Sequence, residues 1–325
     1  MAKRLLSLLT FASLILGLLG LAASVRAQDY PRGPITLIIP LAPGDAADVA
    51  GRAMGDELSR LLNVPIVVNN KPGAGAALGT DQVVKAQKDG YTLVLTINGA
   101  LTFRRVLDPE TATYDPEKDL APLGLATRTP IILAVRSDVP FKNFAEMAVY
   151  GKKNPGAIRV GTAGKGSIGD FAIEIINSLT GAGLVNVPFK GASPAVTALR
   201  GGHIEGVALA LGAVSGHLKS GAMKGIAISN KFPDFPDVPT LPELGYKQNI
   251  LGVSLMFFAP AGVPAEVTNA LVPAIEKVVK NPAIAARLLT LGMVQDYVPP
   301  GKVFEEMREE RRTIEEIAKR VGLTK

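Results

Sequence analysis

The sequence contains no cysteine or tryptophan and only two histidines. Without cysteine, the chain cannot form a disulfide, a thiolate metal site or a lipid-modified cysteine behind a leader. His203 and His217 have no neighbour at the spacing of a metal site or catalytic triad, and the G-x-S-x-G and H-E-x-x-H motifs are absent. We therefore expect no catalytic residue, no metal and no cofactor, and we interpret both histidines as surface or structural residues.

Long apolar runs are restricted to the N-terminus. Lys3 and Arg4 precede an apolar run from Leu5 to Ala23, and Val25-Arg26-Ala27 follows it. This order is typical of a secretory signal peptide, so residues 1–27 are predicted to be removed, although the run is almost long enough for a membrane anchor. The mature protein is expected in the periplasm, soluble and without a lipid anchor.

The chain also has only a small excess of positive over negative charge. The formal net charge is +6, and the predicted loss of Lys3, Arg4 and Arg26 with the leader lowers it to +3. This excess is too small to indicate a nucleic-acid partner. The roughly 300 remaining residues exceed one ordinary hydrophobic core, so two domains are expected.

Strand and helix patterns alternate along the rest of the chain. The β-branched run 34–40 ends at a proline, and apolar residues then recur every three or four positions from Ala46, which predicts strand, turn and helix. Similar units cover 66–95 and, in a second series, 130–209. Such alternation predicts an α/β protein in which each domain is a mostly parallel sheet flanked by helices.

The order of these patterns also suggests domain boundaries. Domain 1 is expected to comprise residues 28–128 and 253–325, and domain 2 residues 129–252. The proline-rich loop 233–242 leads to an apolar strand at 255–258, which could carry the chain back to the first domain. Residues 264–292 and 301–320 are each interpreted as one helix.

The first strand-to-helix junction is a candidate ligand site, and it contains Leu41, Ala42, Pro43, Gly44 and Asp45. Unpaired backbone N–H groups and the positive end of the helix dipole attract anions there, so a carboxylate could be held without an arginine. An ordinary capped turn, in which Asp45 or Asp48 bonds first-turn amides, explains the same residues.

Two further junctions lie in the second series. The first runs from Gly161 to Ser167, and its glycines would let a ligand approach the backbone closely, although a plain glycine turn remains an alternative. It is no phosphate loop, because that motif needs Ser or Thr directly after Gly-Lys. Phe189 and Lys190 follow another strand, at the sheet edge where α/β proteins bind ligands, and Lys190 can equally be a solvated charge.

A series of short motifs runs through the chain in a fixed order: Tyr30-Pro31, Pro40-Leu41-Ala42-Pro43-Gly44 with Asp48 and Arg52, Asn70-Lys71-Pro72-Gly73-Ala74-Gly75, Asp89-Gly90-Tyr91-Thr92-Leu93, Tyr114-Asp115-Pro116 with Lys118-Asp119-Leu120, Asn154-Pro155-Gly156, Gly164-Lys165-Gly166-Ser167, Val187-Pro188-Phe189-Lys190-Gly191 and Pro236-Asp237-Val238-Pro239-Thr240. Together, over about residues 30–322, they resemble the substrate-binding proteins of tripartite tricarboxylate transporters, the Bug family of the TctC type.

The resemblance implies a type 2 periplasmic-binding fold that closes like a hinged trap and delivers its ligand to membrane transporter subunits. It further implies small carboxylates or acidic amino acids as ligands, and we expect the protein to be a monomer. One wall of the site would consist of Leu41, Ala42, Pro43 and Gly44, the other of Thr162, Ala163, Gly164 and Ser167, and Asn98 and Gly99 would border the cleft.

Two positions depart from the family pattern. Asp45 stands where the family usually has a second glycine, and Asp170 where it often has histidine. A fixed anion repels a bound carboxylate, so either both side chains are helix caps or the ligand carries a cationic group. We therefore predict an amphoteric or weakly acidic ligand.

The sequence leaves two other functions open. The same trap could serve as a ligand-sensing accessory of a signalling receptor, because the ligand-binding requirements are identical. A periplasmic hydrolase would have to use Ser167, which has no histidine in its motif.

Overall fold

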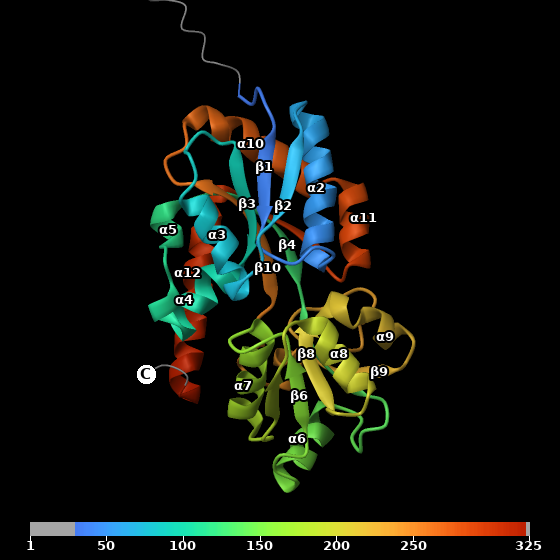
Figure 1. The fold of residues 1–325 in the computed structure, drawn as a ribbon. Helices are drawn as coiled ribbons and strands as arrows, with labels where there is room; N and C mark the ends of the chain where they lie inside the picture. Colours follow the sequence, from blue (N-terminus) through green and yellow to red (C-terminus); the bar gives the residue numbers. More distant parts are fainter. Residues whose placement is uncertain (1–29, 323–325) are drawn as a thin grey trace, which may run out of the picture.

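The computed structural model describes residues 30–322, which form two lobes, each built on one β-sheet (Figure 1). The predicted leader, residues 1–27, lies outside the described residues. We call the lobes A and B after their sheets. The chain passes from sheet A to sheet B at Pro130 and returns to sheet A after residue 252.

Sheet A has the strand order β11-β4-β10-β3-β1-β2. Its strands are β1 (Ile35–Ile39), β2 (Ile66–Asn70), β3 (Thr92–Ile97), β4 (Leu120–Thr129), β10 (Val253–Pro260) and β11 (Val294–Val298). Strand β1 pairs in parallel with β2 and β3, whereas β10 and β11 run antiparallel to their neighbours.

Helices cover both faces of sheet A, as alternation along its strands requires. Leu37 and Ile39 pack against α2, α10 and α11, whereas Ile38 points to the opposite face, toward α3 and α12. The helices of lobe A are α2 (Ala46–Leu62), α3 (Ala77–Val84), α4 (Arg104–Leu107), α5 (Pro116–Asp119), α10 (Ala265–Val279), α11 (Pro282–Thr290) and α12 (Pro300–Val321).

Sheet B has the order β7-β6-β8-β5-β9 and is also covered on both faces. Its strands are β5 (Ile131–Arg136), β6 (Arg159–Thr162), β7 (Val185–Pro188), β8 (Gly206–Ala210) and β9 (Met223–Ile228). Its helices are α6 (Phe144–Lys153), α7 (Ile168–Thr180), α8 (Ala192–Arg200) and α9 (Ser215–Lys219). Strand β6 is parallel to β7 and β8, and β5 is antiparallel to β8 and β9.

The structure confirms an α/β fold with two helix-flanked sheets and corrects two details. Most strands of each sheet share one direction, and only β10 and β11 in sheet A and β5 in sheet B run against it. Residues 264–292 form two helices, since Asn281 caps a new helix whose first residue is Pro282. Strands β4, β9 and β11 were not recognised in the sequence as strands.

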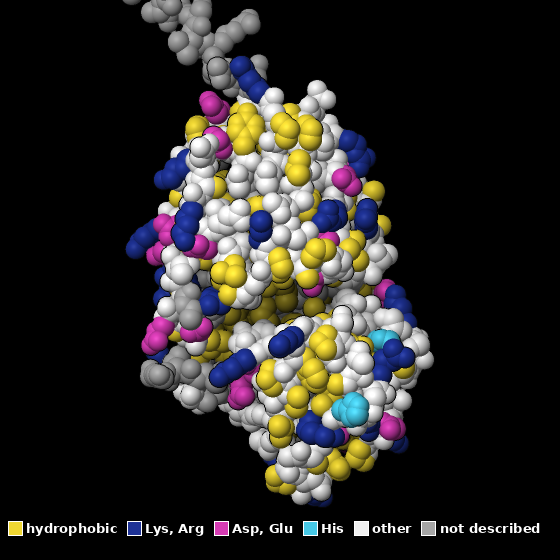
Figure 2. Space-filling view, viewed as in Figure 1, with side chains coloured by type: hydrophobic (Ala, Val, Ile, Leu, Met, Phe, Trp, Pro, Cys, Tyr) yellow, Lys and Arg dark blue, Asp and Glu magenta, His cyan; other side chains and the backbone are white. Residues whose placement is uncertain are grey.

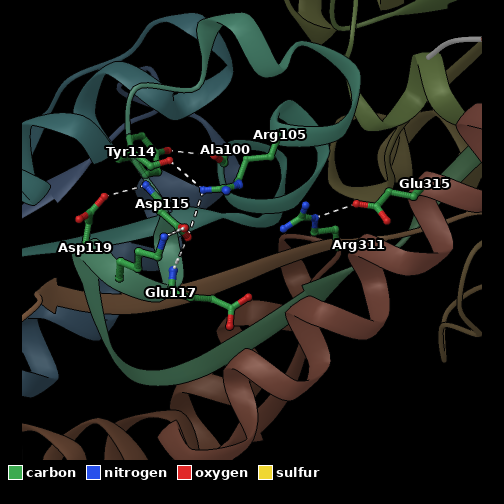
Figure 3. Close-up of polar contacts among 9 residues, drawn as sticks. Ala100, Arg105, Tyr114, Asp115, Glu117, Asp119, Arg311 and Glu315 are labelled. Carbon is green, nitrogen blue, oxygen red and sulfur yellow. Dashed lines mark hydrogen bonds and ion pairs between the residues drawn. The ribbon is translucent and has the colours of Figure 1, made fainter. Parts of the chain in front are cut away.

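The long connection between β3 and β4 is braced by polar contacts (Figure 3). The Tyr114 hydroxyl donates to the Ala100 carbonyl at 2.9 Å, and Arg105 bonds the Tyr114 carbonyl and pairs with Asp115 at 3.1 Å. Asp115 also caps α5, and burial raises the pKa of Tyr114 to about 12. The family motif Tyr114-Asp115-Pro116 therefore has a structural role in holding the segment 99–107.

This segment and α12 connect the two lobes. Phe103 packs edge-on against Phe171 of α7, with ring centroids 5.6 Å apart. Helix α12 belongs to the lobe A core through Met307, whereas Ile314 and Ile317 join the core formed mainly by lobe B. One rigid helix therefore spans both lobes.

The fully buried Asn98 and the half-buried Glu310 form a polar cluster where these parts meet. The Asn98 amide donates to the Gly252 carbonyl at 3.0 Å and to Glu310 at 2.5 Å, and it accepts from the Ser254 N–H at 3.0 Å. The Thr102 hydroxyl donates to the other Glu310 oxygen at 2.6 Å. Burial raises the pKa of Glu310, although the hydrogen bonds from Thr102 and Asn98 and the charge of Arg128 oppose the rise.

Glu310→Gln should remove a pH dependence of stability. Because the pKa of Glu310 is higher in the folded than in the unfolded protein, its contribution is complete below the unfolded pKa. It is lost as pH rises through the folded pKa. Relative to Glu310→Gln, the wild-type free energy of unfolding should therefore fall by about 1 kcal/mol or more over this range, measured by urea unfolding.

The exposed neighbour Glu309, which pairs with Arg312, provides the control. Glu309→Gln should follow the wild-type curve. A Glu310→Gln curve parallel to that of the wild type would show that Glu310 does not titrate on unfolding.

Candidate ligand-binding cleft

A cleft separates the two lobes, with hydrophobic side chains along its floor and Lys or Arg side chains on the rim of lobe B (Figure 2). Strand β8 ends beside Gly212, whose backbone contacts Leu291 of lobe A close to Ala46 at the start of α2. Strands β6 and β7 run in the same direction as β8. The junctions after β6 and β7 therefore lie on the side of lobe B that faces lobe A.

The wall in lobe A is the junction between β1 and α2. Asp45 is the N-cap of α2, and its carboxylate accepts from the Ala47 N–H at 3.0 Å. Asp48 is almost fully buried and accepts from the Gly44 N–H at 2.9 Å and from Arg52 at 3.1 Å. The capped-turn interpretation of both aspartates is thus what the hydrogen bonds show.

Asp48 also holds the glycine-rich loop 70–79 against this wall. The Asn70 amide donates to Asp48 at 2.8 Å and to the Leu41 carbonyl at 3.0 Å. Burial would raise the pKa of Asp48, but the hydrogen bonds from Arg52, Gly44 and Asn70 outweigh it and lower that pKa. Asp48 is therefore an ionised brace beneath the exposed residues 42–45.

The wall in lobe B is the junction between β6 and α7. The Ser167 hydroxyl is the N-cap of α7 and accepts from the Asp170 N–H at 3.2 Å. The Asp170 carboxylate accepts from the Gly166 N–H at 2.7 Å and from the Asn186 amide through a short hydrogen bond. Burial raises the pKa of Asp170, opposed by Gly166 and by the charge of Lys165.

Asn186 on β7 is a residue of this wall that the sequence analysis missed. It links Asp170 to the Thr162 hydroxyl, which donates to the Asn186 oxygen at 3.1 Å. Thr162 is fully buried, so its hydroxyl bonds Asn186 and is not at the surface of the cleft. Its place on β7, the strand paired with β6, is the signal that could have identified Asn186.

Other groups of this wall remain accessible. Ala163 and Lys165 are exposed, and within residues 30–322 no protein acceptor bonds the N–H groups of Gly164 and Lys165. Lys190 is exposed at the neighbouring junction, whereas Phe189 is half-buried and packs over Gly161. Free N–H groups and two ammonium groups make this wall suited to an anion.

The structure gives Asn98 and Gly99 a different location from the two walls. Asn98 is fully buried and its amide is occupied by Gly252, Ser254 and Glu310. Gly99 begins a short π-helix, η3 (Gly99–Phe103). Asn98 therefore has no exposed surface that could line the cleft, whereas Gly99 is half-buried and its place on the border of the cleft stays a prediction.

The cleft contains no recognisable catalytic arrangement within residues 30–322. The Ser167 hydroxyl accepts from the Asp170 N–H, and no histidine of the described chain bonds Ser167. In the same part of the chain, no three His, Cys, Asp or Glu side chains gather where they could hold a metal ion. No helix there combines the length and apolar character of a membrane span.

Asn186→Ala should destabilise lobe B and loosen the loop after β6. It removes hydrogen bonds to Thr162 and Asp170, so the free energy of unfolding should fall by about 1–3 kcal/mol. Amide hydrogen exchange at residues 164–167 should accelerate. Asn69→Ala, at an exposed asparagine of the edge strand β2, should change neither quantity; equal effects of the two substitutions would contradict a bracing role.

The sequence matches the family model of the tripartite tricarboxylate transporter family receptor, TctC, over residues 50–323. Protein BugT of Bordetella pertussis is 31% identical over 88% of this chain and 88% of its own. Among solved structures, periplasmic binding protein BugD is 29% identical with a TM-score of 0.78, covering 91% of this chain and 99% of that one. MatC from Rhodopseudomonas palustris, solved with bound malate, is 28% identical with a TM-score of 0.77, covering 89% and 99%.

Both the sequence and the two-lobed fold thus match solute-binding receptors that are periplasmic. Among the motifs that suggested this resemblance, residues 40–44 and 164–167 lie in the two walls of the cleft. The chain therefore belongs to the tripartite tricarboxylate transporter receptor family, TctC.

Proposed function

We propose that this protein captures a small carboxylate between its two lobes and presents it to the membrane subunits of a tripartite transporter. The observation that carries the proposal is the pairing of two strand-to-helix junctions across one cleft, one of which has accessible N–H groups at Gly164 and Lys165. The malate bound to the related MatC protein supports a ligand of this class.

The ligand carboxylate is placed against lobe B by charge. Lys165 and Lys190 are exposed there, whereas the wall in lobe A presents the exposed carboxylate of Asp45. Asp48, the other acid of that wall, is paired with Arg52 at 3.0 Å. A ligand with one carboxylate, and with an uncharged or cationic group at its other end, suits this arrangement best.

The same proposal includes the organisation of the mature protein. Residues 28–128 with 253–325, and residues 129–252, act as two domains that close on the ligand, and the protein works as a monomer. Its leader is removed after Ala27, and the absence of cysteine leaves no site for a lipid anchor. The mature chain is then free in the periplasm.

Ser167→Ala should weaken carboxylate binding. Ser167 accepts from the Asp170 N–H, which leaves its own proton available for a ligand oxygen. Loss of that hydrogen bond should weaken malate binding by about tenfold in calorimetry. The loss of the N-cap should also cost about 1 kcal/mol of stability.

Asn143→Ala separates these two effects. Asn143 caps α6 through the Glu146 N–H at 2.9 Å and belongs to the same lobe. This variant should lose similar stability and keep full malate affinity. Equal malate affinities of Ser167→Ala and Asn143→Ala would show that Ser167 does not bind the ligand.

Asp45→Asn should shift the preference between ligand classes. Asparagine caps a helix as well as aspartate does, so the substitution removes charge and keeps α2 intact. Repulsion of about 1 kcal/mol at roughly 4 Å in water predicts a severalfold gain in affinity for succinate and a loss for an ω-amino acid of equal length. Asp56→Asn, further along α2, is the control; tight succinate binding that Asp45→Asn leaves unchanged would refute the preference for an amphoteric ligand.

A further inference from the structure

A backbone-to-backbone contact joins the lobes beside the cleft. It lies between Gly212, in the short helix η5 (Leu211–Ala213) after β8, and the turn Leu291-Gly292 between α11 and β11. A Cβ atom placed on Gly212 would lie 2.1 Å from the Leu291 carbonyl oxygen, and one placed on Gly292 would lie 2.5 Å from the Gly212 nitrogen. Neither position has room for a methyl group unless backbone moves.

The glycine at position 212 is explained by this contact and not by its own backbone angles. Gly212 is not among the residues with positive φ, so its turn would accept other residues. Gly292, in contrast, has a φ of +72°. At Gly212, the neighbouring lobe is therefore what excludes a side chain.

The contact is adjacent to the ligand wall of lobe A. The Cβ of Ala46, the first residue of α2, lies 3.8 Å from the position of a Cβ on Gly212. Val294 of β11 packs against the apolar cluster of lobe B at the same place. Any change in the spacing of Gly212 and Leu291 thus shifts the N-terminus of α2 relative to lobe B.

The second contact between the lobes has a different character. There, Phe103 and Phe171 pack edge-to-face, and Ile314 and Ile317 of α12 are fully buried in the same cluster. Separating these side chains would expose apolar surface, which opposes movement apart. The glycine contact is made by backbone atoms, with only the half-buried Val294 packed beside it, so it allows the lobes to turn against each other while it limits how closely they approach.

We propose that the Gly212–Leu291–Gly292 contact is the pivot of domain closure and sets the separation of the two ligand walls. The lobes turn on this contact and on the Phe103–Phe171 contact, which lie on different elements. Gly212 is then a positioning residue: it does not touch the ligand, and it acts through the placement of α2.

Two substitutions introduce a methyl group from opposite sides, and each has a matched control. Gly212→Ala is compared with Gly216→Ala, which has no atom within 4 Å of its Cβ position and no positive φ. Gly292→Ala is compared with Gly221→Ala, which shares the φ of +72° and also has open space. Gly292 and Gly221 share the same φ, and neither Gly212 nor Gly216 has a positive φ, so within each pair the contact is the main difference.

The separation of the lobes is measured with spin labels on cysteines introduced at Val67 of β2 and Val185 of β7, both exposed. The chain has no other cysteine, so labelling is specific. Gly212→Ala and Gly292→Ala should each change the distance distribution of the ligand-free protein relative to the controls. They should also weaken malate binding by about tenfold, whereas the controls bind as the wild type does.

The distance measurement tests the pivot without any ligand, and only the binding measurement rests on the proposed function. Failure of the wild type to bind malate would count against malate as the ligand and would leave the distance test intact. Distances in Gly212→Ala and Gly292→Ala equal to those of their controls would overturn the inference. If one of the two variants does not fold, as judged by circular dichroism, the other decides.

Discussion

The buried amide of Asn98 is the interaction on which the relation of the two lobes depends. It bonds Gly252 and Ser254, where the chain re-enters sheet A, and Glu310 in the middle of α12. A polar group without water must find protein partners, so these elements can meet only in an arrangement that satisfies the amide. The returning strand β10, the π-helix after β3 and the course of α12 across both lobes all follow from that requirement.

The walls of the cleft are rigid because their polar side chains bond their own loops. Asp48 holds Gly44 and Asn70 in lobe A, and Asp170 holds Gly166 and Asn186 in lobe B. Each carboxylate thereby accepts a hydrogen bond from one backbone N–H of its loop, which a ligand anion could otherwise accept. Other N–H groups stay accessible. The proposed carboxylate ligand is therefore compatible with the two aspartates in the walls of the cleft.

Local patterns predicted the second series of strand-helix units over residues 130–209, where α6 and α7 have side-chain N-caps and strong apolar spacing. Strand β4 was missed because Pro122 and Gly124 interrupt its apolar run, and pairing with β10 and β11 on both sides compensates for them. The break at Asn281-Pro282 did have a local signal, a cap followed by proline, which the continuous apolar spacing obscured. The direction of β10 had no local signal in the sequence. This strand runs antiparallel to β3 and β4 because the chain enters it on its return from lobe B.

The sequence by itself determined the alternation of strands and helices, the three junctions that could hold a ligand and, through its motifs, the family. These features depend on the type and spacing of residues within a few positions of one another, so they can be read from the sequence. Only the tertiary structure decided that Asp45 caps α2, that Asp170 bonds the Gly166 N–H and Asn186, and that Asn98 is fully buried. Each of these depends on a hydrogen-bond partner brought close by folding, and the direction of a side chain follows from that partner.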